Sequence, residues 1–189
     1  MGGALLALAL TGAAPDQPPP ERKSESVAQA MCRLIDGAAR SHQLPAAFLT
    51  RLIWRESSFR RGAVSRVGAQ GVAQFMPGTA SERGLLDPFD PEQAIPEAAR
   101  FVSDLKTRFG NLGLAAAAYN GGPNRVSAWL GGTTDLRQET RDYVRFITGR
   151  VVEDWAAQEK SSTSKPGASP GDAATQTCSQ ATALLRVPS

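Results

Sequence analysis

The sequence predicts one small all-α domain between two segments that do not belong to its core. Between about residues 26 and 157, apolar side chains recur at the spacing of a helix face, and no stretch alternates as a half-buried strand would. The chain has 189 residues, 41% of them hydrophobic, which is enough for one core of ordinary size. We therefore expect a leader at 1–25, a helical domain at 26–157 and a tail at 158–189.

The first two helices are expected on either side of Pro45. The segment from Val27 to His42 carries an apolar stripe, formed by Val27, Met31, Leu34, Ile35 and Ala38. Pro45 stands where the first turn of a helix accepts proline. The second helix is therefore expected to run from this proline to about Glu56.

Prolines and glycines place the next helices. Pro77 is expected to open a short helix, "PGTASERG", that ends at Gly84. Pro96 is expected to begin a longer amphipathic helix that stops at Gly110, because glycine commonly follows the last residue of a helix.

Three more helices are expected in the second half of the domain. Leu112 to Asn120 is apolar all round, which is typical of a helix buried on every side, and we expect it at the centre of the core. A short helix, "PNRVSAWL", follows a Gly-Gly break. The segment from Arg137 to Trp155 is expected to form the last long helix.

The two ends of the chain differ in composition from the domain. Ala4 to Leu10 is a short apolar run followed by small residues, which is typical of a secretory signal and too short to span a bilayer. No Lys or Arg precedes this run, so an apolar tail or a fusion remnant is the alternative to export. The tail is rich in Ser, Pro, Gly and Ala, although its end "CSQATALL" could dock as a short helix.

Composition argues against several classes of function. The chain has a single histidine, His42, and two distant cysteines, Cys32 and Cys178, so a Cys/His metal site is not expected and no cofactor is predicted. Buried thiols or one disulfide are better interpretations of the cysteines than a nucleophile with His42. No basic run interleaved with aromatic residues indicates nucleic acid. The net charge of +3 fits an anionic polymer but carries little weight.

Glu56 stands where the helical pattern calls for an apolar side chain. Leu49, Leu52 and Ile53 precede it by seven, four and three residues, so Glu56 completes an inward face. Loss of water and the negative end of the helix dipole would both raise the pKa of this carboxyl group. A carboxylic acid that stays protonated near neutral pH suits a general acid. The alternative is a glutamate that turns out to solvent in the last turn.

Two further segments combine polar residues with glycines. Gly68 to Ala80, "GAQGVAQFMPGTA", offers glycines for tight backbone conformations and Gln74 as a neutral donor and acceptor. Ala117 to Pro123, "AAYNGGP", ends the expected central helix with Tyr119 and Asn120 before a flexible Gly-Gly.

Together with "ESSF" at Glu56 and "ETRDYV" from Glu139 to Val144, these segments resemble the catalytic domain of the family 1 lytic transglycosylases, the soluble type with a lysozyme-like fold. The order of the four motifs matches over roughly Ala28 to Trp155, and the joint match is specific where any one motif would be weak. One departure is Ala73, where the family usually has a bulky apolar residue.

The resemblance implies an activity and a set of site residues. Glu56 matches the family's single acid/base, which protonates the bond between N-acetylmuramic acid and N-acetylglucosamine and then deprotonates the C6 hydroxyl, closing a 1,6-anhydro ring. Glycosidases ordinarily need a second carboxylate; here the substrate's acetamido group and C6 hydroxyl would take that part. The residues implied to line the saccharide groove are Ser57, Gln74, Met76, Tyr119, Asn120 and Tyr143.

These side chains are expected to have different tasks. Tyr143 would orient Glu56, while Gln74 and Asn120 would bond acetamido or hydroxyl groups and Met76 would form an apolar wall. Each has a structural alternative: Met76 as core filler, Asn120 as a helix C-cap and Tyr119 as a buried ring. Glu139, the only carboxylate in another motif, is expected to act structurally near a helix start.

Three functions compete at this point. The first is an exported, periplasmic and monomeric peptidoglycan lytic transglycosylase, whose partners would be glycan strands and an envelope-spanning secretion machine. The second is a hydrolase of the goose-lysozyme type on the same fold, which needs a carboxylate positioned for water. The third is a non-enzymatic wall-binding or scaffold protein, which an intact Glu56 among all four motifs argues against.

Overall fold

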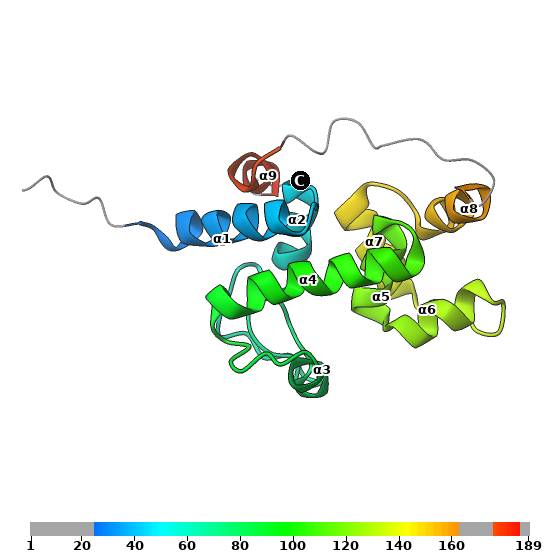
Figure 1. Cartoon of the computed structure of the whole chain (residues 1–189), viewed down its shortest axis with the longest axis horizontal. Coiled ribbons are helices and arrows are strands. Elements are labelled where there is room, and N and C mark those ends of the chain that lie inside the picture. The colour runs from blue at the N-terminus through cyan, green and yellow to red at the C-terminus, as the bar shows by residue number, and fades with distance from the viewer. Residues whose placement is uncertain (1–24, 163–175, 186–189) are drawn as a thin grey trace, which may run out of the picture.

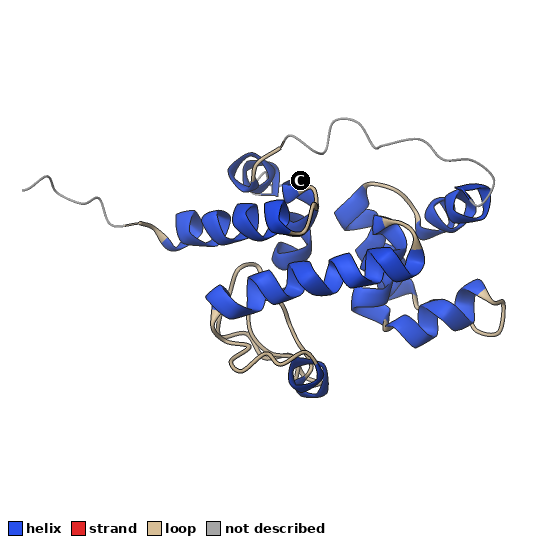
Figure 2. Cartoon of the chain, in the orientation of Figure 1, coloured by secondary structure: helices blue, strands red, loops and turns tan. Residues whose placement is uncertain are grey.

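The computed structural model describes residues 25–162 and 176–185, and within these ranges it is helical, with no strand beyond two isolated bridges (Figure 2). The all-α class is confirmed. The expected leader, apart from its last residue, and most of the expected tail lie outside the described residues. The helices are α1 (Val27–Ser41), α2 (Ala46–Ser57), α3 (Pro77–Glu82), α4 (Pro91–Phe109), α5 (Leu112–Gly121), α6 (Pro123–Leu130), α7 (Gln138–Thr148), α8 (Val152–Ser162) and α9 (Cys178–Leu185).

Helix α5 is the centre of the core, as its composition predicts. It packs against α4, α6, α7 and α8, and Gly113 to Ala118 are buried. A β-carbon at Gly113 would collide with the ring of Trp155, so α8 rests directly on the backbone of α5. Figure 1 shows the long α4 across the middle of the molecule, with α1 and α2 on one side and α3 on the other.

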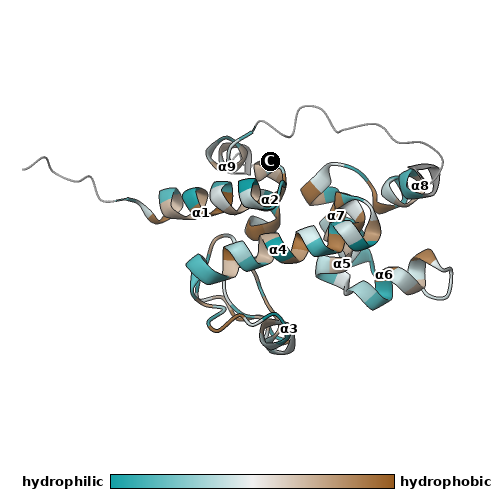
Figure 3. Cartoon of the chain, in the orientation of Figure 1, coloured by the Kyte–Doolittle hydropathy of each residue, from teal (hydrophilic) through white to brown (hydrophobic). Residues whose placement is uncertain are grey.

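The outer helices bury one face each. Teal and brown residues are mixed along α1 and α4 in Figure 3, as expected for helices with one polar side. In α1 the predicted stripe is buried at Met31, Ile35 and Ala38, but Val27 is 71% exposed. Val27 is the first residue of the helix and lies at the rim of a groove beside the start of α4.

Helix α4 begins at Pro91, so the prediction that it starts at Pro96 is wrong. Asp90 caps the helix with its side chain, and Pro91 fills the first helical position, where a missing N–H costs nothing. Pro96 lies inside the helix and removes one backbone hydrogen bond. The full burial of Ala94 and Ile95 in the turn between the two prolines accounts for the longer helix.

The expected last helix from 137 to 155 is two helices, α7 and α8. Gly149 ends α7 in the left-handed conformation, with φ 74°, which glycine adopts at low cost. The indole of Trp155 then donates to the Thr148 hydroxyl at 3.2 Å, which folds α8 back on the end of α7. None of the helices described is long and apolar enough to cross a membrane.

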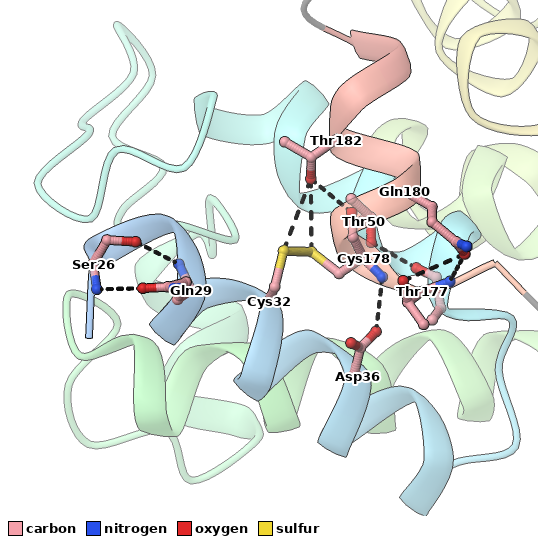
Figure 4. Close-up of a disulfide and its surroundings, with 10 residues drawn as sticks. Ser26, Gln29, Cys32, Asp36, Thr50, Thr177, Cys178, Gln180 and Thr182 are labelled. Carbon is pink, nitrogen blue, oxygen red and sulfur yellow. Dashed lines mark hydrogen bonds between the residues drawn. A yellow bond between two sulfur atoms is a disulfide. The ribbon is translucent and has the colours of Figure 1, made fainter. Parts of the chain in front are cut away.

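Of the two interpretations that the sequence left open for its cysteines, buried thiols or one disulfide, the structure shows the disulfide. Cys32 of α1 and Cys178 of α9 form a disulfide (Figure 4), with 5.1 Å between their Cα atoms. The backbone N–H of Cys178 donates to the Asp36 side chain at 2.9 Å, and Ala181 and Thr182 are buried. Helix α9 contacts both α1 and α2, so the chain's described end is part of the domain.

Removing the disulfide should lower the free energy of unfolding substantially. The bond links residues 146 positions apart, and a loop of that length corresponds to about 5 kcal/mol of chain entropy, taken as an upper figure. We expect the double variant Cys32→Ser/Cys178→Ser to unfold at lower denaturant concentration than the oxidised protein and at the same concentration as the reduced protein. Unfolding midpoints that do not respond to reductant would contradict this.

Candidate active site

A cleft of about 560 Å³ opens where the end of α2, the loop after it, the end of α5 and the start of α7 meet. Six of the seven residues expected at the site line it: Glu56, Gln74, Met76, Tyr119, Asn120 and Tyr143. Their positions in the sequence span almost ninety residues, and the packing of α2 and α5 against α7 brings those on the helices together.

Glu56 lies in the last turn of α2, on the face that the periodicity predicts. Leu49, Leu52 and Ile53 are fully buried below it and fix the rotation of the helix. The hydroxyl of Tyr143 on α7 donates to Oε1 of Glu56. The carboxyl group is therefore held from one side and partly open to the cleft on the other.

The surroundings of Glu56 favour its neutral form. Burial raises the pKa of Glu56 to about 7, and the nearby charge of Glu139 adds to this. The hydrogen bond from Tyr143 and the charge of Arg55 act in the opposite direction, because both favour the carboxylate. With a pKa near 7, the group is present in both protonation states around neutral pH, so it can donate a proton in one step and accept one in the next.

Two tyrosines frame the cleft as neutral donors. Burial raises the pKa of Tyr143 and of Tyr119 well above the ordinary value, so both keep their protons. The Tyr119 hydroxyl donates to the carbonyl of Ala73 at 2.8 Å. Ala73, the departure from the family pattern, is fully buried, and its backbone anchors the loop to α5.

The loop that carries Gln74 is held in an uncommon conformation. Gln74 itself has φ 52°, and its side-chain nitrogen donates to the carbonyls of Gly71 at 2.8 Å and Ala63 at 3.2 Å. Gly71 has φ 73°, and a β-carbon there would collide with the Pro88 carbonyl. A non-glycine residue at positive φ persists only when its surroundings fix it, and such residues gather at functional sites.

Ser57 does not line the cleft, contrary to the expectation. It follows Glu56 by one residue, which turns its side chain by about 100° around the helix axis. The side chain is buried, and its hydroxyl donates to the carbonyl of Val72 at 2.8 Å. Ser57 therefore ties the end of α2 to the loop that carries Gln74.

The other expected residues differ in how they sit relative to the core and the cleft. Met76 is 42% exposed and is not core filler. Asn120 does not cap α5, because Gly122 ends the helix; its Oδ1 accepts a hydrogen bond from the Thr140 hydroxyl at 2.8 Å. Tyr119 is packed against the core, as the alternative has it, and also reaches the cleft.

The cleft also holds charged residues for which the sequence predicts no binding role. Glu139 is the second residue of α7, as expected, but it lines the cleft and is not only a helix-start residue. Arg55 and Arg137 line it as well. Arg55 directly precedes Glu56, and Arg137 lies two residues before Glu139 of the "ETRDYV" motif. This proximity to motif residues is the one feature of the sequence that could have indicated their place in the cleft. Among the described residues, no group of three His, Cys, Asp or Glu side chains could hold a metal ion.

Comparison with known proteins agrees with this geometry. The family model described as "Transglycosylase SLT domain" matches residues 33–141, more than half of the chain. The chain belongs to the transglycosylase SLT domain family. The soluble lytic murein transglycosylase of Escherichia coli K12 is 33% identical over 127 residues, which cover 56% of this SLT-domain chain and 20% of that protein.

Solved structures show the same relationship. An inactive glutamate-to-glutamine mutant of the lytic transglycosylase Slt from Pseudomonas aeruginosa is 30% identical, with a TM-score of 0.55 over 71% of this chain and 24% of that one. A complex of the 70-kDa soluble lytic transglycosylase with bulgecin A is 27% identical, with a TM-score of 0.54 over 70% of this chain and 24% of that one. This SLT-domain chain thus spans only a fifth to a quarter of these relatives.

Replacing Glu56 by glutamine should stabilise the fold in a pH-dependent way. Because the pKa of Glu56 rises from 4.5 unfolded to about 7 folded, burying it costs nothing below pH 4.5 and increasingly more up to pH 7. A shift of this size corresponds to a cost of about 3 kcal/mol at most above pH 7. We expect Glu56→Gln to unfold at higher urea concentration than the parent at pH 8 and at a similar one at pH 4.

The exposed Glu82 of α3 supplies a matched control for this comparison. The Glu82→Gln variant makes the same chemical change without burial, so its stability should follow that of the parent at both pH values. A Glu56→Gln effect that is equal at pH 4 and pH 8 would show that the carboxyl group is not held neutral.

Proposed function

We propose that this chain is a peptidoglycan lytic transglycosylase that cleaves the β-1,4 bond between N-acetylmuramic acid and N-acetylglucosamine. The observation that carries the proposal is the carboxyl group of Glu56 in an open cleft. Its pKa is raised to about 7, and it accepts a hydrogen bond from the Tyr143 hydroxyl. Membership of the SLT family supports it, as does a relative that is inactive with a glutamate replaced by glutamine.

One carboxyl group suffices for the proposed reaction. Protonated Glu56 gives its proton to the glycosidic oxygen, and the bond from that oxygen to C1 of the muramyl residue breaks. The carbonyl oxygen of the 2-acetamido group bonds to C1 in its place. The carboxylate then takes the proton of the C6 hydroxyl, whose oxygen displaces the acetamido group and closes the 1,6-anhydro ring. Glu56 ends protonated, so the cycle needs no further acid, water or metal.

The remaining cleft residues supply contacts with neutral sugars. The side-chain nitrogen of Gln74 is used by backbone carbonyls, which leaves its amide oxygen as an acceptor. Oδ1 of Asn120 is occupied by Thr140, which leaves its amide nitrogen as a donor. Together these groups match the N–H and C=O of an acetamido substituent. Met76 offers an exposed apolar surface to a sugar face.

Ser57 has no direct part in this proposal, because its hydroxyl is committed to Val72. Its contribution is to position the loop that carries Gln74. Tyr143 acts on the reaction through Glu56, whose orientation it fixes.

We also propose that the protein acts as a monomer in the periplasm. The Cys32–Cys178 disulfide supports an oxidising compartment, since such bonds are rare in the cytosol. The relatives include proteins named as soluble and as membrane-bound lytic murein transglycosylases. An envelope-spanning secretion machine stays a predicted partner.

A hydrolase of the goose-lysozyme type is the second candidate, and one observation favours it. Glu139 places another carboxylate in the cleft that contains Glu56, where it could activate water. The two reactions leave different chain ends, since hydrolysis yields a reducing sugar and intramolecular closure yields an anhydro end.

Glu56→Gln should abolish turnover while leaving the fold and binding intact. Glutamine has nearly the same shape but neither donates nor accepts the proton, so we expect a loss of about 1,000-fold or more in rate. Clearing of purified sacculi measures this, with Glu82→Gln as the control that should retain parental activity. Comparable clearing by the Glu56→Gln protein would show that another group is the acid.

The released muropeptides should end in 1,6-anhydromuramic acid. Such ends have no free aldehyde, so they should resist borohydride reduction and carry the mass of a product that has lost water. Mass spectrometry of digested sacculi before and after borohydride treatment measures both. EDTA should have no effect on the rate, because no step of the proposed reaction uses a metal. Mainly reducible ends would assign the protein to the hydrolases and make Glu139 the first residue to replace.

A further inference from the structure

Two arginines stand at the cleft close to the proposed acid. Arg55 directly precedes Glu56 on α2, and Arg137 directly precedes the first residue of α7. Both side chains are exposed, and both line the cleft. The guanidinium of Arg55 lies over the ring of Phe146 on α7, 5.5 Å from its centre. A flat surface under the guanidinium restricts its motion and leaves its N–H edge available to a ligand.

Neither guanidinium has a carboxylate partner within the described ranges 25–162 and 176–185. Other arginines there do form ion pairs, namely Arg33, Arg83, Arg100 and Arg141. Glu139 and Glu56 are the acidic residues that line the cleft, and with a pKa of about 7 Glu56 carries only part of a negative charge near neutral pH. The cleft therefore presents more positive than negative charge to a ligand, although the site is built for a sugar polymer.

The glycan backbone cannot account for this charge. N-acetylglucosamine carries only hydroxyl and acetamido groups, whereas the muramyl residue adds a lactyl ether. That group ends either in a free carboxylate or in an amide bond to a stem peptide, which bears carboxylates of its own. Anionic groups therefore occur only on every second sugar. A guanidinium pairs with a carboxylate through two parallel hydrogen bonds, which fixes orientation as well as adding affinity.

We propose that Arg55 and Arg137 bind a carboxylate carried by the muramyl residue and so select which sugar lies beside Glu56. The inference rests on the proposed function and adds a specificity determinant to it. The carboxylate comes either from the stem peptide or from the lactyl group of a strand whose peptides have been removed. A strand shifted by one sugar would present a neutral residue to the two arginines, so this contact sets the register in which the correct bond meets the acid.

The test compares three glycan strands of equal length. The first retains its stem peptides, the second has been treated with an amidase and has free lactyl carboxylates, and the third has those carboxylates converted to methyl esters. We expect Arg137→Gln to lower the ratio of kcat/KM on the charged strands to kcat/KM on the esterified strand by about 10-fold, chiefly through KM. Arg55→Lys keeps the charge beside Glu56 but loses the two-pronged geometry, and it should lower the same ratio by a smaller factor.

Arg145 of α7 provides the matched control, because it is exposed on the same helix and does not line the cleft. Arg145→Gln removes one positive charge and should leave the ratio at its parental value. Loss on stem-bearing strands alone assigns the contact to a carboxylate of the stem peptide, and loss on amidase-treated strands alone assigns it to the lactyl carboxylate. Loss on both charged strands shows that the two arginines accept either carboxylate. Equal loss on all three strands, the esterified one included, would overturn the proposal.

Failure of the proposed function gives a different result. If the parent cleaves none of the strands, their dissociation constants can be measured on the Glu56→Gln protein with and without Arg137→Gln. The ratio of affinities for charged and esterified strands then replaces the ratio of kcat/KM values. A parent protein that is inactive but binds charged strands more tightly through Arg137 refutes the enzyme and retains the carboxylate site. An active parent enzyme with an unchanged ratio in Arg137→Gln supports the proposed enzyme and refutes the carboxylate site.

Discussion

The site depends on one hydrogen bond between residues 87 positions apart, from the hydroxyl of Tyr143 to the carboxyl group of Glu56. It requires that α2 and α7 lie side by side, and a second contact between these helices supports that arrangement. The side chain of Arg51, on the same helix as Glu56, donates to the carbonyl of Ile147 at 2.7 Å. Helix α5 also packs against α7, and its buried alanines, with their small side chains, allow close approach of the helices around it. The hydrogen bond from Tyr143 offsets part of the cost of placing a carboxyl group this deeply.

The same constraint explains why the loop after α2 is so heavily anchored. Polar contacts to its backbone come from two directions: Ser57 binds Val72, and Tyr119 binds Ala73. These contacts hold Gln74 in a left-handed conformation, which a free loop would leave. The loop lines the cleft together with α2, α5 and α7, so its rigidity helps to fix the space available to a sugar. Two features of the cleft lower the stability of the fold, namely the buried carboxyl group of Glu56 and the strained backbone at Gln74.

Periodicity placed Glu56 on the inward face of its helix, because one carboxylate on an otherwise apolar face is visible in the sequence, whereas its role as the acid came from the family resemblance. It predicted the buried α5 for the same reason. The partners of Glu56 came from the family resemblance, since no local rule links Tyr143 to a residue 87 positions away. Ser57 was misplaced because a motif records neighbours in sequence, whereas one step along a helix changes the direction of a side chain. The start of α4 was predicted wrongly because Pro91 and Pro96 can each occupy the first position of a helix. Only the burial of the residues between them distinguishes the two.

Exposed charge was the least predictable part of the cleft. Arg55 and Arg137 follow no periodic pattern, and their shared location arises only from the packing of α2 against α7. Their position also constrains the acid. The charge of Arg55 favours ionised Glu56, so the cleft must exclude enough water to keep the pKa near 7 against that charge. A bound carboxylate would neutralise the arginine and let burial dominate, which would raise the pKa of the acid once a muramyl residue is in place. Neutralisation of Arg55 would then favour the protonated form of Glu56 when the correct sugar lies beside it.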